Sequence, residues 1–104
     1  MGFFKNLFGL GAKTDYKKLV KNGATIVDVR IDTEYHSGHI KNSINIPLHA
    51  LPGSLEKIDR DKPVIACCAS GIRSGSAVRI LKKNGFTNVY NGGGWSSLLF
   101  KIRG

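Results

Sequence analysis

The chain has 104 residues, of which 41% are apolar and 22% are charged. This composition is typical of a single folded domain with its own core, and it excludes a disordered chain. No apolar run approaches the length of a membrane span, so no transmembrane helix is expected. The formal net charge of +9 could steer small anions or an acidic protein to the chain, but the interpretation favoured over these is a solvated basic surface. Because no nucleic-acid-binding motif accompanies this charge, we predict no nucleic-acid partner.

The two cysteines, Cys67 and Cys68, are neighbours in the chain. Adjacent Cα atoms lie about 3.8 Å apart, below the usual disulfide range, so the pair is not a disulfide framework. Free thiols are typical of a reducing compartment, and we expect a cytoplasmic protein. The chain length and the amphipathic pattern of the helices are compatible with a monomer, which we expect.

Residues 1–12 are interpreted as an N-terminal amphipathic arm, and residues 13–104 as the folded domain. Phe3, Phe4, Leu7 and Phe8 recur in the arm at helical spacing. The pattern favours an arm that packs on the domain. It leaves open a docking role at a membrane surface or on a partner protein.

Helix-like and strand-like segments alternate along the rest of the chain. A first helix is expected after the N-cap pair Thr14–Asp15 and ends at Asn22–Gly23. The segments expected as strands are 24–29, 43–46, 64–67 and 88–90. The further segments expected as helical are a turn at 32–35, a face formed by Leu51, Leu55 and Ile58, a helix from Ser74 to Asn84–Gly85, and a closing helix from Trp95.

Residues 91–94, with the sequence Asn-Gly-Gly-Gly, are expected to form a tight turn between the last strand and the closing helix. The alternation of elements predicts an α/β domain. Its core would be a central parallel sheet of about four to five strands with helices on both faces.

Cys68 lies where a buried strand is expected to end and a helix to begin. Backbone N–H groups of such a loop, together with the positive end of the helix, stabilise an anion, and a thiolate is an anion. Arg73 adds a cation close by in the sequence. The pattern therefore favours a reactive thiolate at Cys68 over the alternative of a structural core cysteine.

The rhodanese family of sulfurtransferases has an active-site loop that resembles residues 68–74, Cys-Ala-Ser-Gly-Ile-Arg-Ser. Residues 26–30, Ile-Val-Asp-Val-Arg, with the segments 34–40 and 43–47 that follow, are similar to the N-terminal signature of that family. Residues 91–95, Asn-Gly-Gly-Gly-Trp, are similar to its glycine-rich turn before a helix that begins with tryptophan. The resemblance implies a rhodanese-like fold from about Thr14 to the end of the chain.

The resemblance also implies an activity and a site. Cys68 would accept sulfur from thiosulfate or a persulfide donor, become a persulfide, and pass that sulfur to a thiol or to cyanide. The donor would be bound by the loop residues Ala69, Ser70, Gly71, Ile72 and Arg73, whose backbone N–H groups surround the sulfur. No metal and no organic cofactor is implied.

Other positions carry structural expectations. Arg30 and Glu34, four residues apart, are expected to form an ion pair of the scaffold. Asp28 either orients the loop from a neighbouring strand or caps a turn. Cys67 is expected to be buried and to point away from Cys68, and a role as a resolving thiol is the less favoured alternative. The three histidines lack the ligand pattern of a metal site and are expected in structural or surface roles; they are His36, His39 and His49.

Rival functions remain open to different degrees. A phosphatase or arsenate reductase is disfavoured, because related phosphate-binding loops have one residue more than the four that separate Cys68 from Arg73. No general acid stands beside the loop either. A non-catalytic interaction module is disfavoured because the cysteine and the full loop are present. The sequence does not separate a free-standing enzyme from a persulfide carrier that serves a partner enzyme.

Overall fold

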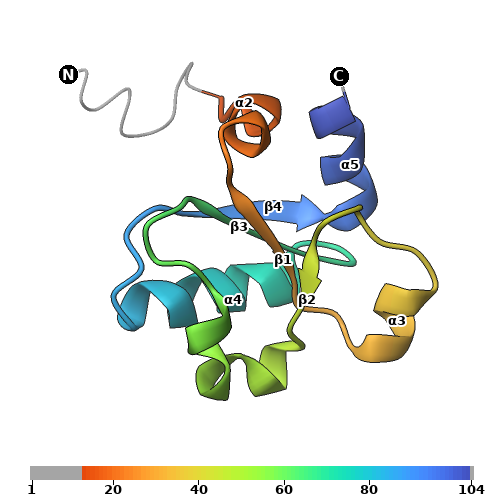
Figure 1. Ribbon diagram of the computed structural model, residues 1–104. Helices are drawn as coiled ribbons and strands as arrows, with labels where there is room; N and C mark the ends of the chain where they lie inside the picture. Colours follow the sequence, from red (N-terminus) through yellow and green to blue (C-terminus); the bar gives the residue numbers. More distant parts are fainter. Residues whose placement is uncertain (1–12, 104) are drawn as a thin grey trace.

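The computed structural model describes residues 13–103. Its centre is a sheet of four parallel strands in the order β2-β1-β3-β4. The central strand β3, Val64–Cys68, is buried along its whole length and lies between β1, Thr25–Asp28, and β4, Val89–Gly94. The strand β2, Ile44–Asn45, forms one edge of the sheet and β4 forms the other (Figure 1). The predicted α/β architecture with a parallel sheet is confirmed.

Helices cover both faces of this sheet. Alternate residues of β3 point to opposite sides, so each face has a core of its own. On one face, Val64, Ala66 and Cys68 pack under the helix α4, Ile72–Lys83, and under two 3₁₀ helices, η1 and η2. The 3₁₀ helices span Leu48–Gly53 and Leu55–Lys57. The other members of this core are Val27, Val29, Ile46, Leu51, Ile58, Ala77, Leu81 and Phe86.

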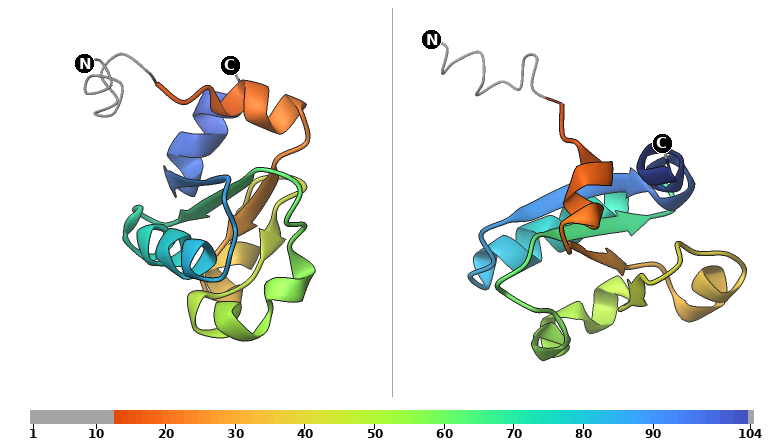
Figure 2. Two further views of the ribbon diagram at one scale, coloured as in Figure 1. Left: turned by 90° about the vertical axis from the view of Figure 1, so that its left-hand side faces the viewer. Right: turned by 45° about the horizontal axis from the view of Figure 1, so that its top comes forward.

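On the other face, Ile65 and Cys67 of β3 pack against α2, Tyr16–Lys21, and α5, Trp95–Arg103. The buried members of this second core are Ile26, Ile40, Ile65, Cys67 and Leu98. Figure 2 shows α2 and α5 together on one side of the sheet, with α4 and the 3₁₀ helices on the other. The Tyr16 hydroxyl donates to Asn91 O of β4 at 3.0 Å, so α2 also contacts the edge strand.

Two local expectations are wrong. Residues 91–94 do not form a turn, because β4 continues through them to Gly94. Ala66 pairs with Asn91, but Cys67 pairs with Gly93, so Gly92 is an extra residue in a bulge of β4. The face of Leu51, Leu55 and Ile58 is not one helix, since the segment forms two short 3₁₀ helices separated at Ser54, and Ile58 follows the second.

The carboxyl ends of the strands meet at one edge of the sheet, beside α3, Asp32–His36 (Figure 1). Ligand sites of open parallel sheets form at this edge. The proposed N-terminal arm, residues 1–12, lies outside the described residues. Within residues 13–103, no helix is long and apolar enough to cross a bilayer.

Candidate active site

Cys68 is the last residue of β3, and α4 begins at Ile72 after a loop of only three residues. The chain reverses here through Gly71, which has a left-handed φ of 103°. A Cβ atom on Gly71 would lie 3.4 Å from Gly93 Cα, an ordinary van der Waals contact, so the left-handed φ is what favours glycine here. Glycine at this position lets the loop turn tightly enough to bring the first turn of α4 over the Cys68 side chain.

The sulfur of Cys68 is surrounded by hydrogen-bond donors from this loop and helix. Gly71 N donates to Sγ at 3.0 Å and Ser74 N donates at 3.3 Å. The Cys68 thiol and the Ser74 hydroxyl are 3.4 Å apart. Gly71 is the N-cap residue of α4 and has no side chain that could cap the helix, so Cys68 Sγ takes that place as the acceptor.

These contacts favour the thiolate. Burial opposes ionisation of Cys68, but the hydrogen bond with the Ser74 side chain and those from the N–H groups of Ser74, Gly71 and Ser70 outweigh it and lower the pKa of the thiol. Cys67 is in the opposite situation. Burial first, and the negative charge of Asp28 second, raise the pKa of Cys67, so this thiol stays protonated.

The two cysteines also belong to different cores, Cys68 to the one under α4 and Cys67 to the one under α5. Cys67 is buried and points away from Cys68, as expected from the alternation of a strand. Cys68 itself has no exposed surface, whereas Ala69 and Ser70 of the loop are exposed. An external reactant therefore reaches the sulfur only when loop atoms move aside.

Arg73 and Ile72, the remaining residues of the expected donor-binding loop, lie on the first turn of α4. Ile72 is 78% exposed at the rim of the loop. Arg73 forms a two-pronged ion pair with Glu34 of α3, with N–O distances of 2.7 and 3.1 Å. The hydrogen bond from Arg73, with a second from Ile31 N, lowers the pKa of Glu34 to about 2. The guanidinium charge is therefore already compensated by Glu34.

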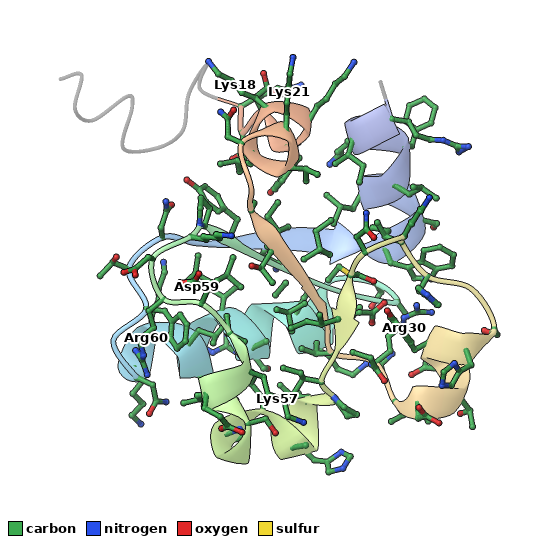
Figure 3. The ribbon with its side chains drawn as sticks, viewed as in Figure 1. Lys18, Lys21, Arg30, Lys57, Asp59 and Arg60 are labelled. Atoms are coloured by element: carbon green, nitrogen blue, oxygen red, sulfur yellow. The ribbon has the colours of Figure 1, made fainter. Side chains whose placement is uncertain are left out.

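The expected Arg30–Glu34 ion pair is wrong. Arg30 is bound to Asp28 through Nε and Nη2, with a shortest distance of 2.7 Å, and both side chains are buried. Arg30 Nη1 reaches Glu34 only at its backbone carbonyl, and Nη2, which also binds Asp28, donates to Gly38 O. Figure 3 shows Arg30 between the sheet and α3. Asp28 also accepts from Arg30 N, which is the turn-capping role.

The structure adds a polar link that the sequence analysis did not predict. Ser74 Oγ donates to Asn91 Oδ1 of β4 at 2.7 Å, and Gly93 N donates to the same oxygen at 2.9 Å. Asn91 Nδ2 in turn donates to Gly71 O at 3.2 Å. Ser74 and Asn91 are 17 positions apart, so local spacing does not indicate this link. The only signal for it in the sequence is that both residues lie in stretches that resemble family motifs.

The histidines do not converge on the site. His36 contacts Asp32 at 3.1 Å on the surface of α3, and His39 Nδ1 contacts Tyr35 O at 2.8 Å while its ring stacks on Tyr35. His49 is exposed on η1. Among residues 13–103, no cluster of histidine, cysteine, aspartate and glutamate has the arrangement of a metal site.

Comparison with known proteins gives the same family as the motifs. The model of the rhodanese-like domain matches residues 12–99. An uncharacterised protein of Bacillus subtilis, YqhL, is 44% identical over 68 residues, which are 65% of this chain and 54% of that protein. The thiosulfate sulfurtransferase GlpE of Pseudomonas savastanoi is 37% identical over 73 residues, which are 70% of this chain and 69% of that protein.

A solved structure agrees with these relatives. The rhodanese-related protein of Thermoplasma volcanium superposes with a TM-score of 0.71 at 33% identity, over 86% of this chain and 90% of that one. The match to YqhL spans only about half of that protein's length. The family model nevertheless covers the strands, the loop at Cys68 and the first half of α5. The chain therefore belongs to the rhodanese-like domain family.

Proposed function

We propose that this protein is a sulfurtransferase that carries sulfane sulfur on Cys68. The observation that supports this most is the position of Cys68 Sγ, at the carboxyl end of β3 and within hydrogen-bond distance of Gly71 N and Ser74 N. A ring of backbone donors around one sulfur atom stabilises a thiolate and an anionic persulfide alike. The GlpE relatives, named thiosulfate sulfurtransferases, support the same reaction class.

The first half-reaction loads the cysteine. The Cys68 thiolate attacks the outer sulfur of thiosulfate, the S–S bond of the donor breaks, and sulfite leaves with the bonding electron pair. The product is a Cys68 persulfide whose terminal sulfur bears the negative charge. A persulfide donor reacts in the same way, and its leaving group is the corresponding thiolate.

The second half-reaction removes the sulfur from the Cys68 persulfide. A thiolate or cyanide attacks the terminal sulfur, the S–S bond to Sγ breaks, and Cys68 leaves as the thiolate. Loop donors that stabilise the Cys68 thiolate make it a good leaving group in this step and a populated nucleophile in the first. Gly71 N and Ser74 N therefore serve both halves of the cycle.

The remaining loop residues have narrower roles in this proposal. Ser70 contributes a backbone donor to the sulfur. Ala69 and Ile72 shape the approach of the donor at the exposed rim. Because Arg73 is paired with Glu34, it acts mainly by fixing the first turn of α4 to α3, and only secondarily on the donor.

The test is the intact mass of the protein after incubation with thiosulfate. Wild type is expected to gain one sulfur atom and to lose it on addition of cyanide, with formation of thiocyanate. Cys68→Ala is expected to gain nothing. Cys67→Ala is the matched control, because it removes the adjacent thiol from the other face of the sheet and should leave the adduct intact.

Absence of an adduct from both thiosulfate and a small-molecule persulfide would contradict the proposal. An adduct that survives in Cys68→Ala but disappears in Cys67→Ala would move the sulfur-carrying role to Cys67.

A further inference from the structure

The direction of one proton beside Cys68 affects the reactivity of its sulfur, and its bearing on sulfur transfer rests on the proposed function. Ser74 is fully buried, so bulk water does not reach its hydroxyl group. Two acceptors compete for the hydroxyl proton, Asn91 Oδ1 at 2.7 Å and Cys68 Sγ at 3.4 Å. A hydroxyl has one proton to donate, and only one of these acceptors receives it at a time.

The hydrogen bonds of Asn91 fix the orientation of its amide. Gly93 N is a donor without acceptor capacity, so the atom that faces it must be the amide oxygen. Gly71 O is an acceptor only, so the atom that faces it must be the amide nitrogen. Both assignments agree, and Oδ1 is therefore the atom that faces Ser74 Oγ.

This orientation decides the direction of the Ser74 hydroxyl in the structure. The amide oxygen has no proton, so Ser74 must donate to Asn91. Ser74 Oγ then presents only a lone pair to Cys68, and Cys68 donates its S–H proton to it. This direction of the Ser74 hydroxyl suits the thiol, whereas the N–H groups of Gly71 and Ser74 stabilise the thiolate. The thiolate needs a donor at the same place, so ionisation requires the Ser74 proton to leave Asn91 and turn to Sγ.

Within the part of the chain that the structure describes, the charged side chains that face the site from the neighbouring elements are paired with one another. Arg73 of α4 is paired with Glu34 of α3, and Asp28 at the end of β1 is paired with Arg30. Cys67 of β3 is held neutral by its burial. Hydrogen bonds, rather than a free cation, therefore decide the protonation state of Cys68.

We propose that Asn91 is a positioning residue for Cys68: it holds the Ser74 hydroxyl proton while Cys68 is a thiol and releases it to Sγ when Cys68 ionises. Asn91 never touches the sulfur in this role and acts through Ser74. Its second contact, from Nδ2 to Gly71 O, anchors the loop that supplies the Gly71 N donor. The edge strand β4 thereby sets the reactivity of a cysteine on β3.

The experiment is a double-mutant cycle on Ser74 and Asn91, read out as the pKa of Cys68. Thiolate absorbance and the rate of iodoacetamide alkylation are followed against pH in a Cys67→Ala background, which leaves one thiol. Ser74→Ala removes the only side-chain hydrogen-bond partner of Cys68 Sγ within residues 13–103 and should raise the pKa. Asn91→Ala removes the competing acceptor and should lower it, by roughly half a pKa unit or more, a threefold or larger change in the thiolate ratio at a given pH.

The cycle separates the two contacts of Asn91. Loss of the hydrogen bond from Asn91 to Gly71 O affects the Cys68 pKa with or without the Ser74 hydroxyl. Release of the Ser74 proton to Sγ affects it only when that hydroxyl is present. Asn91→Ala should therefore change the pKa much less in the Ser74→Ala background than in the presence of Ser74. Equal changes in both backgrounds would overturn the proposal, and so would no change in either.

Asn91→Asp provides a second variant in case Asn91→Ala does not fold. The carboxylate is a stronger acceptor for the Ser74 proton than the amide, so this variant should raise the Cys68 pKa. A pKa that falls in Asn91→Asp would overturn the proposal. The readout uses protein that has met no sulfur donor, so its outcome is independent of whether Cys68 transfers sulfur. If it does, the pH profile of persulfide formation should shift in parallel.

Discussion

At the scale of single residues, the structure shows how neighbouring side chains of one kind acquire different chemistry. Cys67 and Cys68 are both buried, yet hydrogen bonds lower the pKa of Cys68 while burial and Asp28 raise that of Cys67. The difference comes from the partners that each face of the sheet provides. Exposure alone would not distinguish the two thiols.

The partners of Glu34 show what sequence spacing leaves out. Arg30 is four residues away and has the right charge, but the true partner of the Glu34 carboxylate is Arg73, which is 39 residues away. Arg30 pairs with Asp28 instead, because a fully buried carboxylate is costly unless a cation lies beside it. Local spacing predicts an ion pair only where no buried group competes for the same charge.

Glu34→Gln should make the pH dependence of stability shallower on the acid side. The pKa of Glu34 is lowered from 4.5 to about 2 in the folded protein, chiefly by Arg73. A carboxylate with a lowered pKa stabilises the fold fully above its unfolded-state pKa, and this contribution is lost as the pH falls toward the folded value. The wild type should therefore exceed Glu34→Gln in stability at neutral pH, with a difference that shrinks below about pH 4.5.

Urea midpoints of both proteins across this pH range measure the effect. Both carboxylate and guanidinium are about one-third exposed, so the difference at neutral pH should be modest. Glu56→Gln on η2 controls for the loss of one negative charge, since this exposed residue forms no ion pair within residues 13–103. A gap that stays constant down to about pH 3 would contradict the assigned role of the pair.

At the scale of elements, the strands were predictable from short local patterns, a buried apolar run for β1 and β3 and an alternation of apolar and polar residues for β2. The segments expected at 24–29, 43–46, 64–67 and 88–90 correspond to β1, β2, β3 and the start of β4. The closing helix was expected from the spacing of its apolar residues and begins at Trp95 as predicted. These elements depend on local patterns that the sequence contains.

The continuation of β4 through residues 91–94 was not predictable in the same way. Glycine has low strand propensity and suggests a turn, but here Gly92 and Gly94 are required by neighbours from distant segments. A Cβ on Gly92 would lie 2.8 Å from Ile65 Cγ2 and 2.9 Å from Leu98 Cδ2. A Cβ on Gly94 would lie 2.8 Å from Ala69 O, in the loop that follows Cys68.

Gly92→Ala should therefore mainly lower stability, whereas Gly94→Ala should mainly slow the reaction of Cys68. Gly92→Ala overfills the core between β3 and α5 and should lower the free energy of unfolding by about 1–3 kcal/mol. Gly94→Ala pushes on the backbone of the Cys68 loop and should slow persulfide formation by about tenfold or more, because reacting groups tolerate little displacement.

Unfolding in urea and single-turnover loading with thiosulfate give the two measurements. Gly53→Ala is the control, since a Cβ there would meet nothing within 4 Å. It should leave both quantities close to wild type. Rapid loading in a well-folded Gly94→Ala protein would show that the closeness of β4 to the loop does not matter for the reaction.

At the scale of the whole molecule, Arg30 connects parts of the chain that are far apart. It binds Asp28 at the end of β1, the carbonyls of Glu34 and Gly38 around α3, and the ring of Trp95 at the start of α5, 4.7 Å from its guanidinium carbon. These elements surround the edge of the sheet where Cys68 lies. The rigidity of the site thus depends on one cation that does not contact the sulfur.

Arg30→Met should destabilise the whole protein by about 3–5 kcal/mol, because it leaves the buried Asp28 carboxylate without its cation. Arg30→Lys keeps the charge but loses the planar fork that reaches several acceptors at once, so it should fall between wild type and Arg30→Met. The free energy of unfolding in urea measures both.

The double variant Asp28→Asn, Arg30→Met tests whether the unpaired carboxylate of Asp28 causes the loss of stability in Arg30→Met. Removing the carboxylate charge together with the arginine should recover part of the stability lost in Arg30→Met alone. A double variant that is less stable than Arg30→Met would show that packing of the arginine on Trp95, rather than the buried charge, dominates.

The contact between Tyr16 and β4 has a consequence for the behaviour of the protein at high concentration. An open sheet ends in strands whose unpaired backbone groups invite a strand from another molecule. Here one border strand, β2, is only two residues long, which gives an incoming chain little to pair with. On the other border, the hydroxyl of Tyr16 occupies Asn91 O, and α2 lies across α5 beside it. The helix that completes the second core thereby also discourages the edge-to-edge association from which aggregates grow.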